Sequence, residues 1–252
     1  MNAPAGEAMR PQDYPRRVLL LVTGLSPQVV TETLFALAVD SPDPWIPLEV
    51  EVLTTTEGAE RVRLALLSQQ PGWFARLCTD YQLPPIRFGA ASIHVVHDAS
   101  GRPLEDIRRV TDSEQAADQI TERVRQLTAD PACALHVSIA GGRKTMGYYA
   151  GYALSLYGRP QDRLSHVLVS EPFEASWDFF YPAPASRVMT TRDNKLVDAA
   201  DARITLAEIP FLRLRDGLPT RLIHGAATFG ESVAAAQRAL APPDLVIDLE
   251  SE

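Results

Sequence analysis

Cysteine is scarce, since the chain of 252 residues has only Cys78 and Cys133. Two cysteines do not make a disulfide framework, so we expect a reducing, cytoplasmic compartment. Long apolar runs are also missing, because runs such as that at 18–22 are far below the roughly 20 residues that span a bilayer. The N-terminal residues lack the apolar stretch and small-residue cleavage site of a signal peptide. The sequence therefore predicts a protein without membrane contact.

Positive charge is the second scarcity, with 24 Lys and Arg against 32 Asp and Glu and a net charge of −8. Broad binding to duplex nucleic acid needs a basic face, so we expect none. A small anionic ligand held in one local basic pocket is compatible with this charge.

Metal-binding patterns are missing as well. Of the five histidines, His94 and His97 do not have the spacing of a zinc-binding pair. His136 and His166 alternate with apolar neighbours, which is typical of hydrogen-bonded histidines in the core or at the edge of a sheet. The sequence predicts no metal, no cofactor and no cysteine nucleophile.

Hydrophobic residues make up 46% of the chain and charged residues 22%, which is ordinary for a globular protein and excludes a disordered one. Apolar segments of strand length alternate with segments of helical periodicity. Strands are expected at 17–23, 48–53, 93–96, 135–139 and 165–169, and helices at 29–39, 57–68, 72–80, 113–127 and 145–157. This alternation predicts an α/β fold with a Rossmann-like, doubly wound, mostly parallel sheet.

Three parts are expected along the chain. Residues 1–15 are rich in Pro, Ala and Gly and are expected to be flexible. Residues 16–182 are expected to form the Rossmann-like domain, and 183–252 a small C-terminal extension. Within the extension, strands are expected at 203–206 and 211–214, and a helix at 229–240.

Two loops are expected where open parallel sheets bind ligands, beyond the carboxyl ends of the strands. The first, at 23–28, follows the first strand, and the second, at 138–146, follows the strand at 135–139. Each runs into a helix N-terminus, whose free N–H groups and partial positive charge suit a phosphate. In the first loop we expect Ser26 to cap the following helix and Pro27 to occupy its first position.

The second loop is the sharper candidate. Gly141 and Gly142 permit a ligand to approach the backbone closely. Arg143 offers a planar fork for two phosphate oxygens, and Lys144 offers a point charge. Two cations at a helix N-terminus oppose the helix dipole, which favours an anion nearby. The alternative is a glycine pair that merely ends a strand before a solvated helix start.

Neither loop has a common nucleotide-binding pattern. A P-loop needs glycine where Ser138 and Arg143 stand, and a dinucleotide fingerprint needs a second glycine where Ser26 stands. Binding of ordinary NAD or ATP is therefore disfavoured. A charged loop with Asp106, Arg108 and Arg109 is a third candidate, for which local ion pairs in solvent are the alternative.

Five segments together resemble a known family. They are VTGLSPQVVTETL at 22–34, SIAGGRKTM at 138–146, ALSLYGR at 153–159, DRLSHVLV at 162–169 and AEIPFLRLR at 207–215. They are similar to CRISPR-associated proteins with a CRISPR-associated Rossmann fold (CARF) domain, the ring nucleases of type III systems. The resemblance implies a homodimer that binds cyclic oligoadenylate, most often cyclic tetra-adenylate, and cuts it without metal to switch off antiviral signalling. The extension would then pack on or near the dimer.

The same resemblance implies roles for individual residues. Ser26 and Lys144 match the loop serine and loop lysine of related ring nucleases, and with Arg143 as a phosphate clamp they are the expected catalytic residues. The expected ligand-binding residues are Gly24, Leu25, Gln28, Thr31, Ala140, Gly141, Gly142, Thr145, Met146, Arg108 and Arg109. The implied reaction is attack of a ribose 2′-hydroxyl on the neighbouring phosphorus, which needs in-line geometry and stabilisation of the developing charge.

Two other functions stay open at this point. One is a sensor that binds the same ring without cutting it, and the other is a Rossmann-like enzyme for a small phosphorylated metabolite. Arg87 and His94 have the spacing of an effector ribonuclease motif, but they lie in a Pro-rich, strand-like segment, so we interpret the match as chance. The mixed charge of the extension disfavours a DNA-binding arm.

Overall fold

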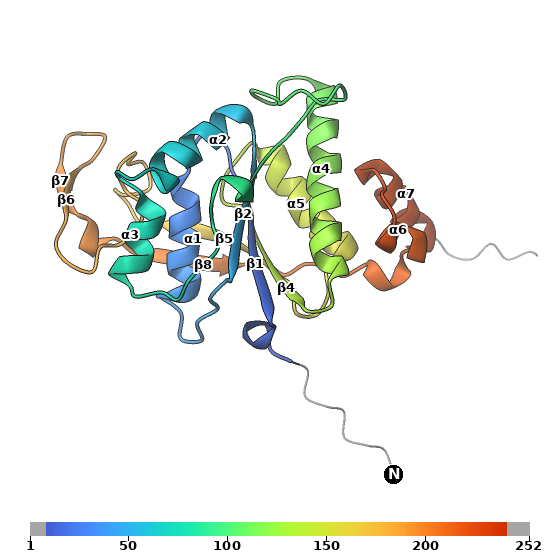
Figure 1. Ribbon diagram of the computed structural model, residues 1–252, viewed down its shortest axis with the longest axis horizontal. Helices are drawn as coiled ribbons and strands as arrows, with labels where there is room; N and C mark the ends of the chain where they lie inside the picture. The colour runs from blue at the N-terminus through green and yellow to red at the C-terminus, as the bar shows by residue number, and fades with distance from the viewer. Residues whose placement is uncertain (1–8, 241–252) are drawn as a thin grey trace, which may run out of the picture.

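The computed structural model describes residues 9–240, which form helical layers on both faces of a six-stranded sheet (Figure 1). The strands lie in the order β3-β2-β1-β4-β5-β8. Their bounds are Arg16–Val22 for β1, Glu49–Thr54 for β2, Ile93–Val95 for β3, Cys133–Ser138 for β4, Arg163–Val169 for β5 and Ile204–Glu208 for β8. Strands β1 to β5 are parallel, and β8 runs antiparallel to β5. The predicted Rossmann-like, doubly wound, mostly parallel sheet is confirmed.

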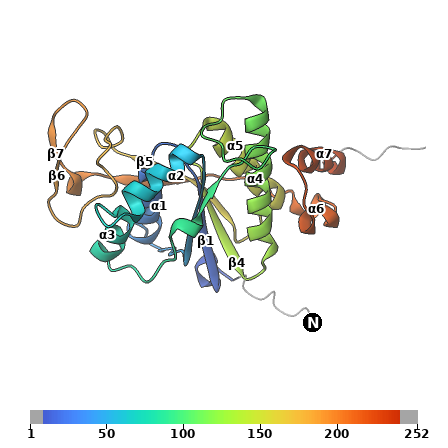
Figure 2. The same ribbon diagram turned by 45° about the horizontal axis from the view of Figure 1, so that its top comes forward.

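Helices cover the two faces of this sheet, as Figures 1 and 2 show. One face carries α1 (Gln28–Ala38) and α3 (Trp73–Asp80). The other carries α4 (Val110–Ala129) and α5 (Lys144–Tyr157). Helix α2 (Thr56–Val62) follows β2 and continues into a π-helical segment at 63–67. Within residues 9–240, no helix is both long and apolar enough to cross a membrane.

The central strand β1 explains why the sheet needs both layers. Leu19 and Leu21 belong to the core on the α1 side. Val18, Leu20 and Val22 belong to the core on the side of α4 and α5. All five side chains are fully buried, as expected of a continuous apolar run in a parallel strand with helices on both faces.

Residues beyond 182 are added to opposite sides of this domain. Strand β8 extends the sheet, and the hairpin of β6 (Val188–Thr190) and β7 (Leu196–Asp198) projects beyond α3 (Figure 1). Helices α6 (Thr220–His224) and α7 (Phe229–Leu240) pack against α4 on the far side. The predicted C-terminal extension therefore contributes to the central sheet as well as to an outer helical layer.

The expected elements of this extension are present with one exception. Strand β8 lies where the strand at 203–206 is expected, and α7 matches the helix expected at 229–240. The strand expected at 211–214 was wrong, because β8 already occupies the free edge of β5 and the segment runs instead beside α5. There the Leu214 N–H donates to the Ser155 carbonyl at 2.8 Å.

The expected flexible N-terminus lies only partly within the structure. Its residues 9–15 contain a short 3-10 helix at Pro11–Asp13. Its residues 1–8, like residues 241–252 of the predicted extension, lie outside the described residues.

A buried ion pair joins β4 to the turn that follows α5. The Asp162 carboxylate accepts hydrogen bonds from the Leu135 N–H at 3.0 Å and from Arg159 Nε at 2.9 Å. Arg159 also donates through Nη2 to the Cys133 carbonyl at 2.7 Å. Asp162 is fully buried, so removing its carboxylate would leave the Arg159 charge without a partner in the interior.

We predict that Asp162→Ala lowers the free energy of unfolding by about 3–5 kcal/mol, because a buried charge loses its partner. Chemical denaturation followed by circular dichroism measures this loss. The control is Asp193→Ala, since Asp193 pairs with Lys195 where both side chains are exposed, and its unfolding midpoint should stay near that of the wild type. Equal midpoints for the two variants would contradict the role given to Asp162.

Candidate functional site

Two loops meet where the strand order of the sheet reverses. The 23–27 loop leads from β1 to α1, and the 139–143 loop leads from the neighbouring β4 to α5 on the opposite face. The loops touch through glycines, because a Cβ added to Gly24 would lie 3.2 Å from the Cα of Gly142. Gly142 has a φ of +81°, a left-handed conformation that favours glycine. A side chain at position 24 would therefore press on the backbone of Gly142, and a side chain at position 142 would be strained by the left-handed conformation.

Helix α2 comes equally close to the first loop. Thr55 caps this helix by accepting a hydrogen bond from the Gly58 N–H at 3.4 Å. A Cβ added to Gly58 would lie 2.7 Å from the carbonyl oxygen of Gly24. The N-terminal ends of three helices, α1, α2 and α5, therefore converge on one region at the carboxyl edge of the sheet.

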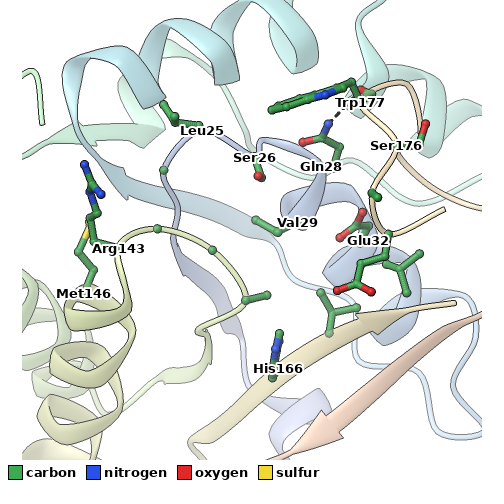
Figure 3. Close-up of a pocket in the computed structure, with 18 of the residues that line it drawn as sticks. Leu25, Ser26, Gln28, Val29, Glu32, Arg143, Met146, His166, Ser176 and Trp177 are labelled. Carbon is green, nitrogen blue, oxygen red and sulfur yellow. Dashed lines mark hydrogen bonds between the residues drawn. The ribbon is translucent and has the colours of Figure 1, made fainter. Parts of the chain in front are cut away.

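A cleft of about 660 Å³ lies in this region (Figure 3). Besides the two loops, α1, α2, β5, the segment after β5 and the β6–β7 hairpin contribute to its walls. Its volume is in the range of roughly 300–1,000 Å³ that is usual for small-molecule sites.

Most of the residues predicted for the site line this cleft. The nine that do are Gly24, Leu25, Ser26, Gln28, Ala140, Gly141, Gly142, Arg143 and Met146. The five that do not are Thr31, Lys144, Thr145, Arg108 and Arg109. Both predicted loops thus line one cleft, and the predicted residues that do not line it are single side chains.

The side chains outside the lining have other surroundings. Thr31 is fully buried, and its hydroxyl donates to the Gln28 carbonyl of the same helix at 2.9 Å. Its side chain therefore bonds within α1 and does not face the cleft. Arg109 pairs with Asp112 at 2.7 Å, which is the local ion pairing considered as the alternative for this loop. Lys144 is exposed and is the first residue of α5, next to the lining residue Arg143.

Ser26 lies in the cleft wall but does not cap α1. The N-cap position belongs to Pro27, whose carbonyl accepts the first helical hydrogen bond from the Val30 N–H at 3.1 Å. The expected N-cap role of Ser26 was therefore wrong by one residue, because the helix begins later than the motif suggests. The Ser26 carbonyl accepts a hydrogen bond from Thr23 Oγ1, while its own hydroxyl is exposed and has no hydrogen-bond partner among residues 9–240.

Arg143 is already engaged by an anion of the protein. Its Nε donates to Asp106 Oδ1 at 3.0 Å, and its Nη2 donates to Asp106 Oδ2. This pairing with Arg143 is the main reason why the pKa of Asp106 is lowered to about 2, and Arg108 adds a further hydrogen bond. Arg143 and Lys144 at the N-terminus of α5 favour an anion nearby, and the carboxylate of Asp106 is such an anion.

Glu32 is the site residue that sequence reasoning missed. It lines the cleft from α1, is only 8% exposed, and has no hydrogen bond or ion pair with any residue in 9–240. Burial raises the pKa of this carboxyl to about 8, with a further contribution from the nearby charge of Glu174. One feature of the sequence could have pointed to Glu32, because it is the single charged residue in the segment 28–38. In the structure every residue of this segment is buried.

Gln28 connects this side of the cleft to the segment after β5. Its Nε2 donates to the Trp177 carbonyl at 2.9 Å, shown by the dashed line in Figure 3. The amide orientation follows from this contact, since only the NH₂ group can donate to a carbonyl. The remaining atom, Oε1, is buried without a hydrogen-bond partner in the described structure. Gln28 thus positions the backbone of Trp177, a residue that is 63% exposed and lines the cleft.

The two strand histidines differ from each other. His136 fits the expectation of a hydrogen-bonded core residue, because its Nε2 lies 2.7 Å from Ser165 Oγ and burial lowers its pKa to about 3. His166 does not fit it: this residue lines the cleft, and its buried Nδ1 has no partner among residues 9–240. The pattern of alternating apolar neighbours did not distinguish them, because β5 meets the cleft with its carboxyl end.

A profile of the CRISPR-associated protein NE0113 family (Cas_NE0113) matches residues 26–242. The chain belongs to this family. The expected membership of a CRISPR-associated family is thereby confirmed. No curated protein matches the chain. Among solved structures, Enterococcus italicus Csm6 bound to cyclic hexa-2′-fluoro-hexa-dAMP is similar at 14% identity and a TM-score of 0.37. The match covers 62% of this chain and 34% of that one, so the chain spans about a third of the length of Csm6.

We predict that Glu32 makes folding stability fall as the pH rises. Its pKa is about 8 in the folded protein against an ordinary value of 4.5, so the folded state retains a proton that the unfolded chain has released. Between these two pKa values, Glu32 lowers the free energy of unfolding by up to about 1.4 kcal/mol for each unit of pH increase. Glu32→Gln removes this cost, so the variant should gain stability relative to the wild type from pH 5 to pH 8 in urea titrations. Parallel stability curves for the two proteins would disprove the shift.

Proposed function

We propose that this protein binds cyclic oligoadenylate, with cyclic tetra-adenylate as the preferred ring, and cleaves it without a metal ion in a type III CRISPR system. The observation that carries the proposal is the contact of Gly24 with Gly142, which brings two loops at helix N-termini to one cleft. Backbone N–H groups and helix dipoles suit the phosphates of such a ring. Membership of a CRISPR-associated family supports the biological context.

A homodimer is part of this proposal. A closed ring of four identical nucleotides has its own two-fold symmetry, and two copies of the chain related by a two-fold axis would present each loop twice. Each cleft would then hold half of the ring. Convergence of two clefts also gathers cations locally in a protein whose net charge is −8.

The proposed reaction uses the substrate's own ribose as nucleophile. The 2′-oxygen forms a bond to phosphorus while the bond from phosphorus to the 5′-oxygen breaks. The hydroxyl proton leaves to solvent, and the 5′-oxygen takes a proton from solvent, which gives a 2′,3′-cyclic phosphate and a 5′-hydroxyl. Binding imposes the in-line geometry, and no cofactor enters the step.

Three residues are proposed to carry this reaction. Lys144, at the exposed start of α5, would stabilise the charge that develops on the phosphorus oxygens. Ser26, whose exposed hydroxyl makes no hydrogen bond to residues 9–240, would orient the 2′-hydroxyl or hold the phosphate. Arg143 would clamp the phosphate once it leaves Asp106.

We predict that Lys144→Ala leaves the fold intact and lowers cleavage of cyclic tetra-adenylate by orders of magnitude, because the developing charge loses its cation. Chromatography of the products, with a chelator present, measures the rate. Lys195→Ala is the matched control, since Lys195 is the other lysine of the chain and is exposed on the β6–β7 hairpin. It should cleave like the wild type.

The same assay separates the alternative functions. Wild-type cleavage by Lys144→Ala would remove this lysine from the mechanism. Tight binding by the wild-type protein without linear products would make it a sensor of the ring. Absence of binding would favour an enzyme for a small phosphorylated metabolite.

We further predict that Asp106→Asn binds the ring several-fold more tightly than the wild type does, because phosphate no longer competes with a carboxylate for Arg143. The probe is 2′-deoxy-2′-fluoro cyclic tetra-adenylate, which has no attacking hydroxyl, and calorimetry measures its affinity. Asp98→Asn is the control: it removes the same charge from a side chain of similar exposure, 16% against 17%, outside the cleft lining. Equal affinities for the two variants would contradict the competition.

A further inference from the structure

The cleft has two ends of different chemistry. At one end lie the glycine loops and Arg143, which suit phosphate. At the other end lie Glu32, Glu174 and the exposed indole of Trp177, which suit no phosphate. Figure 3 shows Arg143 and Met146 on one side, and Gln28, Glu32 and Trp177 across the cleft from them. A nucleotide that places its phosphate at the first end would extend its base toward the second.

Glu32 is a buried acid that nothing in residues 9–240 pairs with. It is 8% exposed, belongs to the cleft wall, and makes neither a hydrogen bond nor an ion pair within that part of the chain. Because Glu32 belongs to the cleft wall and no other side chain of the described residues holds its carboxyl group, that group is free to bind a ligand in the cleft. The carboxyl is held in its neutral form by burial and by Glu174, since its pKa is about 8.

A neutral carboxyl group offers one donor and one acceptor side by side. Adenine presents the complementary pair on two edges, namely the exocyclic amino group beside N1 and the same amino group beside N7. The pairing edge of guanine, with its two adjacent N–H groups, instead matches an ionised carboxylate. A neutral glutamic acid therefore suits adenine, and it does not repel the phosphates of the same ligand.

We propose that Glu32 is a specificity-determining residue that hydrogen-bonds the amino edge of an adenine base stacked on Trp177. The inference rests on the proposed function, because it concerns how the same cleft selects an adenylate ring. Gln28 supports the arrangement, since its hydrogen bond to the Trp177 carbonyl holds the indole's segment beside α1. Base stacking on an exposed aromatic ring is a common means of holding a nucleobase.

Other charged groups surround the cleft and enter its pH dependence. Each comes from a different element around the cleft. They are Glu57 from α2, Asp106 from the loop before α4, Arg143 from the start of α5, His166 from β5, Glu174 from the segment after β5 and Arg192 from the β6–β7 hairpin. Strand β8 and helix α3, which also pack on α1, contribute no side chain to the lining. Glu174 is the neighbour whose charge acts on Glu32.

The test compares two rings on three proteins by calorimetry. The rings are 2′-deoxy-2′-fluoro cyclic tetra-adenylate and the same ring built from unsubstituted purine, which lacks the exocyclic amino groups. The wild type should prefer the adenine ring by about tenfold or more, as expected for a paired base edge. Glu32→Ala should lose this preference. Glu32→Gln should keep it, because an amide also offers one donor and one acceptor.

The pH profile separates a hydrogen-bonding role from a merely structural one. Wild-type affinity for the adenine ring should fall as the pH rises above about 8, where the carboxyl ionises, whereas Glu32→Gln should bind independently of this transition. Glu60→Gln, which changes an exposed glutamate of α2 outside the cleft lining, is the control and should bind both rings as the wild type does.

Each outcome bears on a different claim. Wild-type preference retained by Glu32→Ala, or a pH profile unchanged in Glu32→Gln, would overturn the role of Glu32 and leave ring binding intact. If Glu32→Ala fails to fold, the comparison of Glu32→Gln with the wild type still decides the matter. Failure of the wild-type protein to bind either ring would overturn the proposed function, and the inference with it.

Discussion

Close approach of two backbone segments is the constraint on which the site depends. Strands β1 and β4 are neighbours, but the helices that follow them cover opposite faces of the sheet, so their loops diverge around a crevice. In this chain the loops still touch, because Gly24 and Gly142 have no side chains and Gly142 adopts a left-handed conformation. Gly58 permits α2 to join them in the same way. The result is a concave surface rich in N–H groups, formed by backbone and therefore independent of the net charge of the protein.

The two ends of the cleft differ in how their charge is balanced in the free protein. The cationic end is closed in the free protein by the pair of Arg143 with Asp106. The opposite end keeps Glu32 neutral through burial, at a cost to stability that rises with pH. A polyanion with purine bases would exchange the first pair for contacts with phosphate and supply the second with a partner. Under the proposed function, the stability that the free protein loses at Glu32 would contribute to selectivity when the ligand binds.

Much of this architecture was predictable from the sequence, because it follows from local patterns. The apolar run of β1, the alternation of strands with helices, and the two loops before α1 and α5 each appear within short segments. What could not be predicted depends on tertiary contacts. In the sequence, Glu32 is one charged residue in a segment that is otherwise uncharged, and only the fold places it in a cleft wall shared with β5 and its following segment. The partner of Arg143 lies 37 residues away in sequence, and the strand expected at 211–214 was lost to competition from β8.

The most direct test of the central claim is a crystal structure of the protein with 2′-deoxy-2′-fluoro cyclic tetra-adenylate. The account predicts one ring between two copies of the chain, with phosphates against the 23–27 and 139–143 loops of each copy. It also predicts that Arg143 has turned from Asp106 to a phosphate oxygen. A ring bound away from the contact of Gly24 with Gly142, or held by a single copy of the chain, would contradict it.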